Sequence, residues 1–190
     1  IKLSLKGFEY YSKESKKENE KGEDEKNTKE KTAIDKKIFT EIYKFREKTN
    51  LVFPNSRNFV ESIVYECNQL SKSNNQNEVF YPHHSFLSKD IRFDIEEKAR
   101  TSKLPITIAC TSTLELGIDI GTVDNVFQVG PPPSVSSLRQ RLGRSGRRES
   151  SPILRVLIAE DPINEHFIFD NQIRSKLLET ISCLSLIADG

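Results

Sequence analysis

Five arginines stand close together in the segment RQRLGRSGRRE (139–149), and two glycines lie between them. The arginines are Arg139, Arg141, Arg144, Arg147 and Arg148, and the glycines are Gly143 and Gly146. At a separation of ~8 Å and an effective dielectric constant of ~20, each like-charged pair costs about 2 kcal/mol before salt screening. Because guanidinium groups bind phosphate oxygens through paired hydrogen bonds, we expect this segment to receive a phosphate-bearing ligand. A solvated basic patch is the alternative, although such a patch does not need the glycines.

A second segment, TSTLELGIDIG (111–121), combines hydroxyl groups with glycines and a carboxylate. Thr111 offers a hydroxyl group, and Gly117 permits a close approach that a Cβ atom would block. Asp119 lies between two isoleucines, so its carboxylate needs hydrogen-bond donors. Those donors can be the hydroxyls of a bound sugar or the amides of its own loop, and the sequence leaves both open.

Two further positions carry polar side chains that could contact an anion. Ser56 and Arg57 begin a predicted helix, where free N–H groups favour negative charge; a serine cap beside a solvated arginine is the alternative. His83 and His84 are adjacent, but no third ligand lies at a spacing that suits a metal ion. A neutral imidazole can donate to a phosphate, or it can pack on the backbone of its loop.

Absent motifs narrow the chemistry further. The sequence contains no G-x-x-x-x-G-K-[ST] motif, the loop that cradles the phosphates of a nucleoside triphosphate. The acidic run at 23–25 lies in a low-complexity tract and not after a strand, so it does not predict a magnesium site. Phosphate-binding arginines without a phosphate cradle predict one half of a composite site, whose other half lies outside this sequence.

Short apolar runs alternate with helical patterns along the chain, which indicates β-α-β units and a parallel sheet covered on both faces. The predicted strands are 1–5, 51–53, 79–81, 104–110, 123–129 and 153–159. The predicted helices are 34–48, one from about 56, one capped by Ser88, one capped by Ser134 or Ser136, and 170–188. The strand at 1–5 alternates apolar and polar residues and is expected to be half-buried. The polar segments described above follow strand ends, where such folds place their sites.

The composition bounds the class of protein. A chain of 190 residues makes one domain, and its net charge of +1 excludes a globally basic nucleic-acid binder. Three widely spaced cysteines do not suggest a disulfide framework, and no apolar run approaches the ~18 residues of a membrane span. We therefore expect a cytoplasmic protein. Methionine is absent even at position 1, which predicts a fragment of a longer protein, and the charged tract 12–33 is predicted to be a disordered loop.

Four segments, in order, resemble the motifs of the second RecA-like domain of superfamily 2 DEAD/DEAH-type helicases, above all those of the large helicase-related (Lhr) family. LVFPNSR (51–57) resembles motif IV, HHSFLSKDIR (83–92) the following HHG-type motif, TSTLELGIDIG (111–121) motif V and QRLGRSGRR (140–148) motif VI. QVGPPPS (128–134) is also typical of that family. The resemblance implies an α/β fold, a RecA-like three-layer sandwich with a mainly parallel sheet flanked by helices. Residues 1–190 would form a single helicase C-terminal domain.

The resemblance also implies a set of nucleotide contacts. Arg144 and Arg147 would reach the γ-phosphate of ATP held by a preceding domain, with Arg147 as the arginine finger. Gln140 would line the same cleft, Asp119 would lie near the nucleotide ribose, and Gly117 would let its loop approach. The implied cofactors are ATP and Mg²⁺, held mainly by the absent first domain.

The nucleic-acid contacts follow from the same resemblance. Thr111 would bind the backbone of the strand, helped by Ser56, Arg57 and His84. Ser85 stands where the family has glycine. Because that loop contacts the strand, the added side chain can tighten or displace the contact.

The sequence therefore predicts the second motor domain of an ATP-dependent DNA or RNA helicase, an ATP hydrolase that is inactive as the isolated fragment. Its partners would be single- or double-stranded nucleic acid and the N-terminal RecA-like domain of the same chain, with no membrane. The alternatives are a non-catalytic RecA-like scaffold module and a free-standing nucleic-acid-binding domain.

Overall fold

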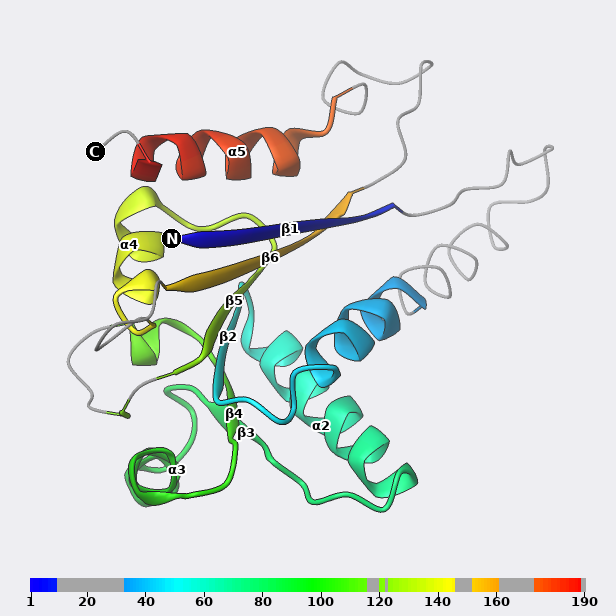
Figure 1. The fold of residues 1–190 in the computed structure, drawn as a ribbon, viewed down its shortest axis with the longest axis vertical. Coiled ribbons are helices and arrows are strands. Elements are labelled where there is room, and N and C mark those ends of the chain that lie inside the picture. The colour runs from blue at the N-terminus through cyan, green and yellow to red at the C-terminus, as the bar shows by residue number, and fades with distance from the viewer. Residues whose placement is uncertain (10–32, 116–119, 122, 146–151, 161–172, 189–190) are drawn as a thin grey trace, which may run out of the picture.

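Six parallel strands form one sheet at the centre of the structure, a computed structural model (Figure 1). The structure describes residues 1–9, 33–115, 120–121, 123–145, 152–160 and 173–188. The strands are β1 (Lys2–Glu9), β2 (Asn50–Pro54), β3 (Phe80–His83), β4 (Thr107–Cys110), β5 (Asn125–Val129) and β6 (Ile153–Glu160). They lie in the order β1-β6-β5-β2-β4-β3, and every neighbouring pair is parallel. The predicted parallel sheet is confirmed.

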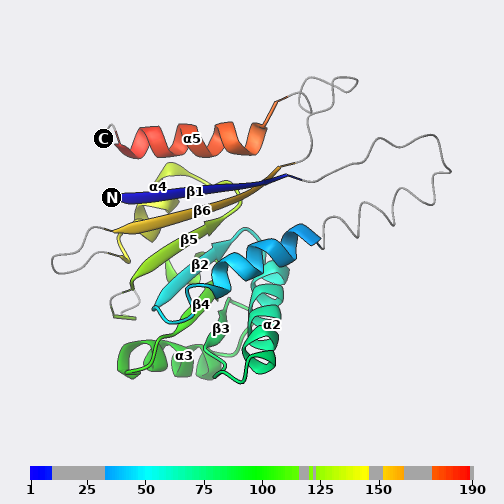
Figure 2. The same cartoon turned by 45° about the vertical axis from the view of Figure 1, so that its right-hand side comes forward.

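Helices cover both faces of this sheet, which gives three layers. The helices are residues 33–43, α2 (Arg57–Ser73), α3 (Lys89–Thr101), α4 (Val135–Leu142) and α5 (Ser175–Ala188), with a short 3-10 turn, η1, at Ser112–Leu114. Leu51 and Phe53 of β2 point into a core shared with α3, α4 and α5, whereas Val52 points into a core shared with α2 and helix 33–43. Figure 2 shows helix 33–43 and α2 together on one side of the sheet. The predicted RecA-like three-layer sandwich is confirmed.

Serine side chains start three of the helices. Ser56 Oγ accepts from the backbone N–H of Phe59 at 3.2 Å, and Ser88 Oγ accepts in the same way at 3.3 Å. Ser134 Oγ accepts at 3.0 Å and so caps α4, which decides between the two serines that the sequence offered. Each cap satisfies an N–H group that the first turn of a helix leaves without a partner.

The first strand forms as predicted but is not half-buried. β1 lies at the edge of the sheet, where β6 is its one partner among the described residues. The apolar side chains at its start are exposed, Ile1 by 65%, Leu3 by 51% and Leu5 by 40%, whereas Phe8 near its end packs against the core. The alternation of apolar and polar residues therefore predicted the strand correctly but not its exposure, because no helix of the described residues covers the three exposed side chains. Within the part of the chain that the structure describes, no helix has both the length and the apolar character that a membrane span requires. The predicted charged loop, 12–33, lies outside the described residues except for its last residue, which begins helix 33–43.

Candidate functional site

The polar segments singled out in the sequence meet at one edge of the sheet. Ser56 and Arg57 follow β2, His84 follows β3, Thr111 follows β4 and Gly130 follows β5. Because all these strands are parallel, their carboxyl ends lie at the same edge. We call this the strand-end edge.

A buried arginine on α4 is held from three sides. Arg141 is only 3% exposed; its Nε donates to Glu115 Oε1 at 2.9 Å, and its Nη2 donates to the same oxygen. Its Nη1 donates to Gln128 Oε1, and its guanidinium group lies 4.7 Å from the centre of the Phe53 ring. Ser137, one turn earlier on α4, donates its hydroxyl to Glu115 Oε1 at 2.7 Å. This buried carboxylate network fixes α4 against the segment that follows η1.

The next arginine of the segment, Arg144, uses its side chain to contact the backbone of the same residue, Glu115. Arg144 is half-buried, and its Nη2 and Nε donate to the carbonyl oxygen of Glu115 at 2.7 and 3.3 Å. Its own N–H donates to the Arg141 carbonyl at 3.1 Å, which continues the turn beyond α4. Gln140, also half-buried, lies in the last turn of α4, four residues before Arg144. The arginine segment and the loop after β4 are thus joined at Glu115.

A fixed loop after β5 completes this part of the edge. Gly130 has a φ of +81°, a backbone conformation that favours glycine, and an added Cβ atom would lie 2.9 Å from Asn55 Nδ2 and displace the end of that side chain. Gln128 Nε2 donates to the Gly130 carbonyl at 3.0 Å, and Asn55 Nδ2 donates to the Pro131 carbonyl at 2.8 Å. The loops after β2 and β5 are therefore tied together.

The two histidines are both buried and have different partners. His83 Nε2 lies 2.8 Å from Glu96 Oε1, and its Nδ1 lies 2.8 Å from Thr113 Oγ1. Burial lowers the pKa of His83, and the hydrogen bond with Glu96 opposes that change. His84 is 4% exposed and its Nε2 bonds with Glu61 at 2.6 Å, while its buried Nδ1 has no hydrogen-bond partner in the described part of the chain.

The remaining predicted contacts are spread along the edge. Ser56 acts as the cap of α2, as the simpler interpretation of that segment had it. Arg57 is exposed, and its guanidinium group lies 4.0 Å from the centre of the Phe86 ring. Thr111 is half-buried, and its N–H donates to the His83 carbonyl at 3.3 Å. The structure thus places Ser56, Arg57, His84 and Thr111 at one edge, and their predicted role stays a prediction.

Three predicted site residues, Gly117, Asp119 and Arg147, lie outside the described residues.

The arginine segment has a partner inside the fold that was not predicted from the sequence. The expectation that this segment needs an external anion is wrong for Arg141, because the Glu115 carboxylate neutralises it inside the fold. Glu115 and Gln128 were not predicted as partners of Arg141. They lie 26 and 13 residues from it along the chain, and no local pattern in the sequence indicates a contact at such separations. One signal was present: Ser137 and Arg141 are four residues apart among buried positions of a helix, which is unusual for polar side chains.

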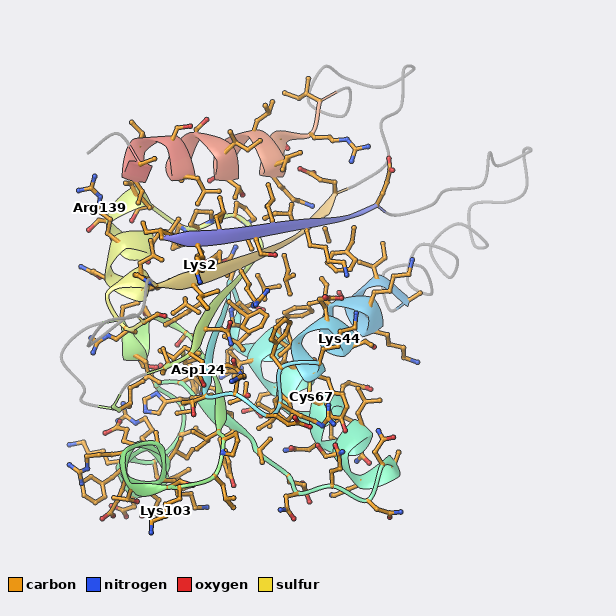
Figure 3. All side chains as sticks on the ribbon, in the orientation of Figure 1. Lys2, Lys44, Cys67, Lys103, Asp124 and Arg139 are labelled. Atoms are coloured by element: carbon orange, nitrogen blue, oxygen red, sulfur yellow. The ribbon has the colours of Figure 1, made fainter. Side chains whose placement is uncertain are left out.

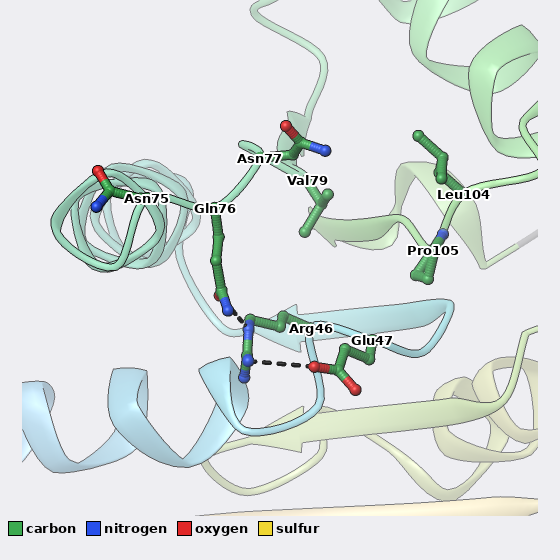
Figure 4. A pocket seen from close by; sticks show the side chains of 8 residues that line it. All are labelled: Arg46, Glu47, Asn75, Gln76, Asn77, Val79, Leu104 and Pro105. Carbon is green, nitrogen blue, oxygen red and sulfur yellow. Dashed lines mark hydrogen bonds and ion pairs between the residues drawn. The ribbon is translucent and has the colours of Figure 1, made fainter.

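A separate pocket lies at the opposite edge of the sheet. Figure 4 shows it between Arg46, Gln76 and the residues that precede β3 and β4, Val79 and Pro105 among them. Arg46 bonds with Gln76 across it, and Arg46 Nη2 pairs with Glu47 at 3.2 Å. None of the predicted site residues lines this pocket, so the strand-end edge remains the candidate site.

The parallel sheet, the two helical layers and the arginine segment attached to the loop after β4 are the features expected of a RecA-like domain. A family profile described as the helicase conserved C-terminal domain matches residues 11–149. The chain belongs to this family, and the family inferred from the sequence motifs is confirmed.

Relatives and a solved structure agree with this assignment. The ATP-dependent helicase Lhr-Core of Saccharolobus solfataricus is 36% identical over 153 residues, which are 78% of this chain and 17% of that protein. Lhr-Core of Sulfolobus acidocaldarius is 39% identical over 124 residues, which are 63% of this chain and 14% of that protein. The structure of Mycobacterium smegmatis helicase Lhr bound to ssDNA and AMP-PNP matches with a TM-score of 0.67 and 23% identity, over 100% of this chain and 22% of that chain. The chain thus spans less than a fifth of the length of these curated relatives.

Proposed function

We propose that this domain is the second motor lobe of an ATP-dependent nucleic-acid helicase, in which Arg144 and Arg147 complete the ATP site of a preceding lobe of the same protein. The observation that carries the proposal is the attachment of Arg144 to the Glu115 carbonyl, with Nη2 at 2.7 Å. This contact couples a phosphate-binding side chain to the loop that leaves the strand-end edge. Closure of the two lobes on ATP would bring the guanidinium groups onto the negative charge that develops at the γ-phosphate.

The nucleotide contacts in this proposal are shared by five residues. Arg144, Arg147 and Gln140 would face the phosphates, and Gly117 and Asp119 would lie near the ribose. Guanidinium donors suit ATP, whereas the described residues contain no group of three or more side chains that could hold a metal ion. In keeping with the resemblance to helicases, Mg²⁺ in this proposal would be held mainly by the preceding lobe.

The strand contacts in this proposal are made along the strand-end edge. Arg57 is exposed and can pair with a phosphate, and Thr111 lies one strand away. Ser56 already accepts a hydrogen bond through Oγ, and its hydroxyl hydrogen can donate to a phosphate. His84 is buried against Glu61, so a direct contact with the strand requires this side chain to move. The bound ssDNA and AMP-PNP of the M. smegmatis Lhr structure support a strand and a nucleotide as the two ligands.

The test uses the full-length protein that carries this domain. Arg144→Ala and Arg147→Ala are each compared with Arg139→Ala, which removes the same charge from the same segment. Arg139 donates to the Leu186 carbonyl at 3.1 Å, and Figure 3 shows it beside the end of α5, so its loss should leave the site intact. Loss of Arg147 should lower strand-stimulated ATP turnover by roughly 10³-fold or more, because an arginine finger contributes about 10³–10⁵ in rate. Strand binding should change little.

Two results would contradict the proposal. ATP turnover of Arg144→Ala and Arg147→Ala within a factor of three of the Arg139→Ala value would remove both residues from the ATP site. A wild-type protein that binds the strand without any ATP hydrolysis would favour the non-catalytic scaffold module instead.

A further inference from the structure

An exposed phenylalanine stands at the strand-end edge beside a candidate strand contact. Phe86 is 78% exposed, the largest value among the large hydrophobic side chains of the described residues. Burying a phenylalanine side chain is worth about 1.5–3 kcal/mol, so leaving it in water forgoes that stabilisation. A single exposed apolar residue is ordinary on a protein surface, and exposure alone assigns no role to this one.

The surroundings of Phe86 hold it in place. Its turn is closed by a hydrogen bond from the Leu87 N–H to the His84 carbonyl at 3.1 Å. Two other residues of the turn point inward: His84 is buried against Glu61, and Leu87 packs against the core. The turn is therefore anchored at both ends and presents Phe86 outward. Little conformational entropy remains to be lost when a ligand contacts this ring.

Arg57 covers part of the ring and adds a positive charge to the same spot. The guanidinium group lies 4.0 Å from the centre of the Phe86 ring, a cation–π contact between the start of α2 and the turn after β3. An aromatic ring beside a guanidinium group presents two complementary surfaces. The ring can stack on a flat π system, and the guanidinium group can pair with a phosphate.

We propose that Phe86 and Arg57 form a stacking site for one unpaired base of a nucleic-acid strand, with Arg57 on a neighbouring phosphate. This inference rests on the proposed function, since it names how the strand is held. The ligand is a single strand because base faces are accessible only when bases are unstacked from a duplex. Stacking does not distinguish bases, so the site grips the strand without reading its sequence.

The test measures how tightly the full-length protein binds a thymidine 12-mer, its uridine counterpart and a 12-mer of abasic deoxyribose phosphates. Phe86→Ala should weaken binding of both base-containing strands by roughly 5-fold or more, since stacking of one base contributes about 1–3 kcal/mol. Binding of the abasic strand should change less than 2-fold. Phe86→Tyr keeps an aromatic ring and should restore binding to near the wild-type value.

The matched control is Tyr65→Ala. Tyr65 is 62% exposed and lies eight residues after Arg57 along α2, which is about 12 Å by helical rise. Its loss should leave all three affinities unchanged. Equal losses for base-containing and abasic strands in Phe86→Ala would overturn the stacking site and indicate a purely structural role. Unchanged binding in Phe86→Ala would overturn it as well while leaving the proposed function standing. A wild-type protein that binds none of the strands would remove both.

Discussion

Replacing Glu115 by alanine should destabilise the domain strongly, because it leaves a buried charge without its counter-ion. Arg141 is 3% exposed, and two of its nitrogens donate to the Glu115 carboxylate. Breaking a buried ion pair by removing one partner typically costs about 3–5 kcal/mol. Gln128 still accepts one hydrogen bond from Arg141, and the Phe53 ring still faces the guanidinium group. We therefore expect the free energy of unfolding to fall by an amount near the lower end of this range, about 3 kcal/mol.

Two comparison variants separate the charge from the hydrogen bonds. Ser137→Ala removes one hydrogen bond to the Glu115 carboxylate, which keeps its contacts with Arg141, and should cost about 1 kcal/mol. The double variant Glu115→Leu/Arg141→Leu removes both charges and fills the space with apolar groups. It should be more stable than Glu115→Ala alone, because no unpaired buried charge remains.

Urea unfolding followed by circular dichroism is the assay. With an m-value of about 1–3 kcal/mol/M, a loss of 3 kcal/mol lowers the urea midpoint by at least about 1 M. A decrease below 0.3 M for Glu115→Ala, or a double variant less stable than Glu115→Ala, would refute the argument that the carboxylate neutralises a buried guanidinium group.

Three other outcomes are expected from the wild-type contacts. Burial lowers the pKa of His83, so the folded state resists protonation of this side chain. The free energy of unfolding should therefore be retained above the ordinary pKa of about 6.5 and should fall as the pH drops below that value. The fall is at most about 1.4 kcal/mol per pH unit. The urea midpoint of His83→Gln should fall less between pH 7.5 and 5.5, and an equal fall would contradict this. Burial raises the pKa of Cys67 to about 12 and also raises the pKa of the fully buried Cys110. An aromatic disulfide reagent at pH 8 should therefore modify Cys183 first and the other two thiols only when the protein unfolds. Prompt modification of all three cysteines would contradict this expectation. Gly130→Ala should lower the urea midpoint, because a φ of +81° is strained for any residue with a Cβ atom; an unchanged midpoint would show that the loop relaxes freely.

Most of the fold could be predicted from local patterns in the sequence. Each of the six strands was predicted close to its observed position, and the serine caps at Ser56, Ser88 and Ser134 were all within the expected set. Local signals suffice here because apolar runs and capping side chains act over a few residues. β4 starts only at Thr107, later than the predicted 104, since Pro105 has no N–H group to donate to a neighbouring strand.

The candidate site was predictable only in part. Parallel strands were enough to bring Ser56, Arg57, His84 and Thr111 to one edge. The pairing of Glu115 with Arg141 was not predictable, because it depends on how α4 packs against the loop after β4. The clustered arginines do need countercharges, and one of these, the Glu115 carboxylate, comes from within the fold.

The position of β1 constrains how the chain can fold as it leaves the ribosome. Lys2 pairs with Ile153, so the earliest strand of this sequence binds one of the latest. At translation rates of about 5–20 residues per second, the intervening ~150 residues take roughly 8–30 s to emerge. During that interval the apolar side chains of the N-terminal segment are in contact with water, without their hydrogen-bonding neighbour. β1 can therefore join this sheet only after β6 has been made, when the strands between β6 and the opposite edge are already available to pair.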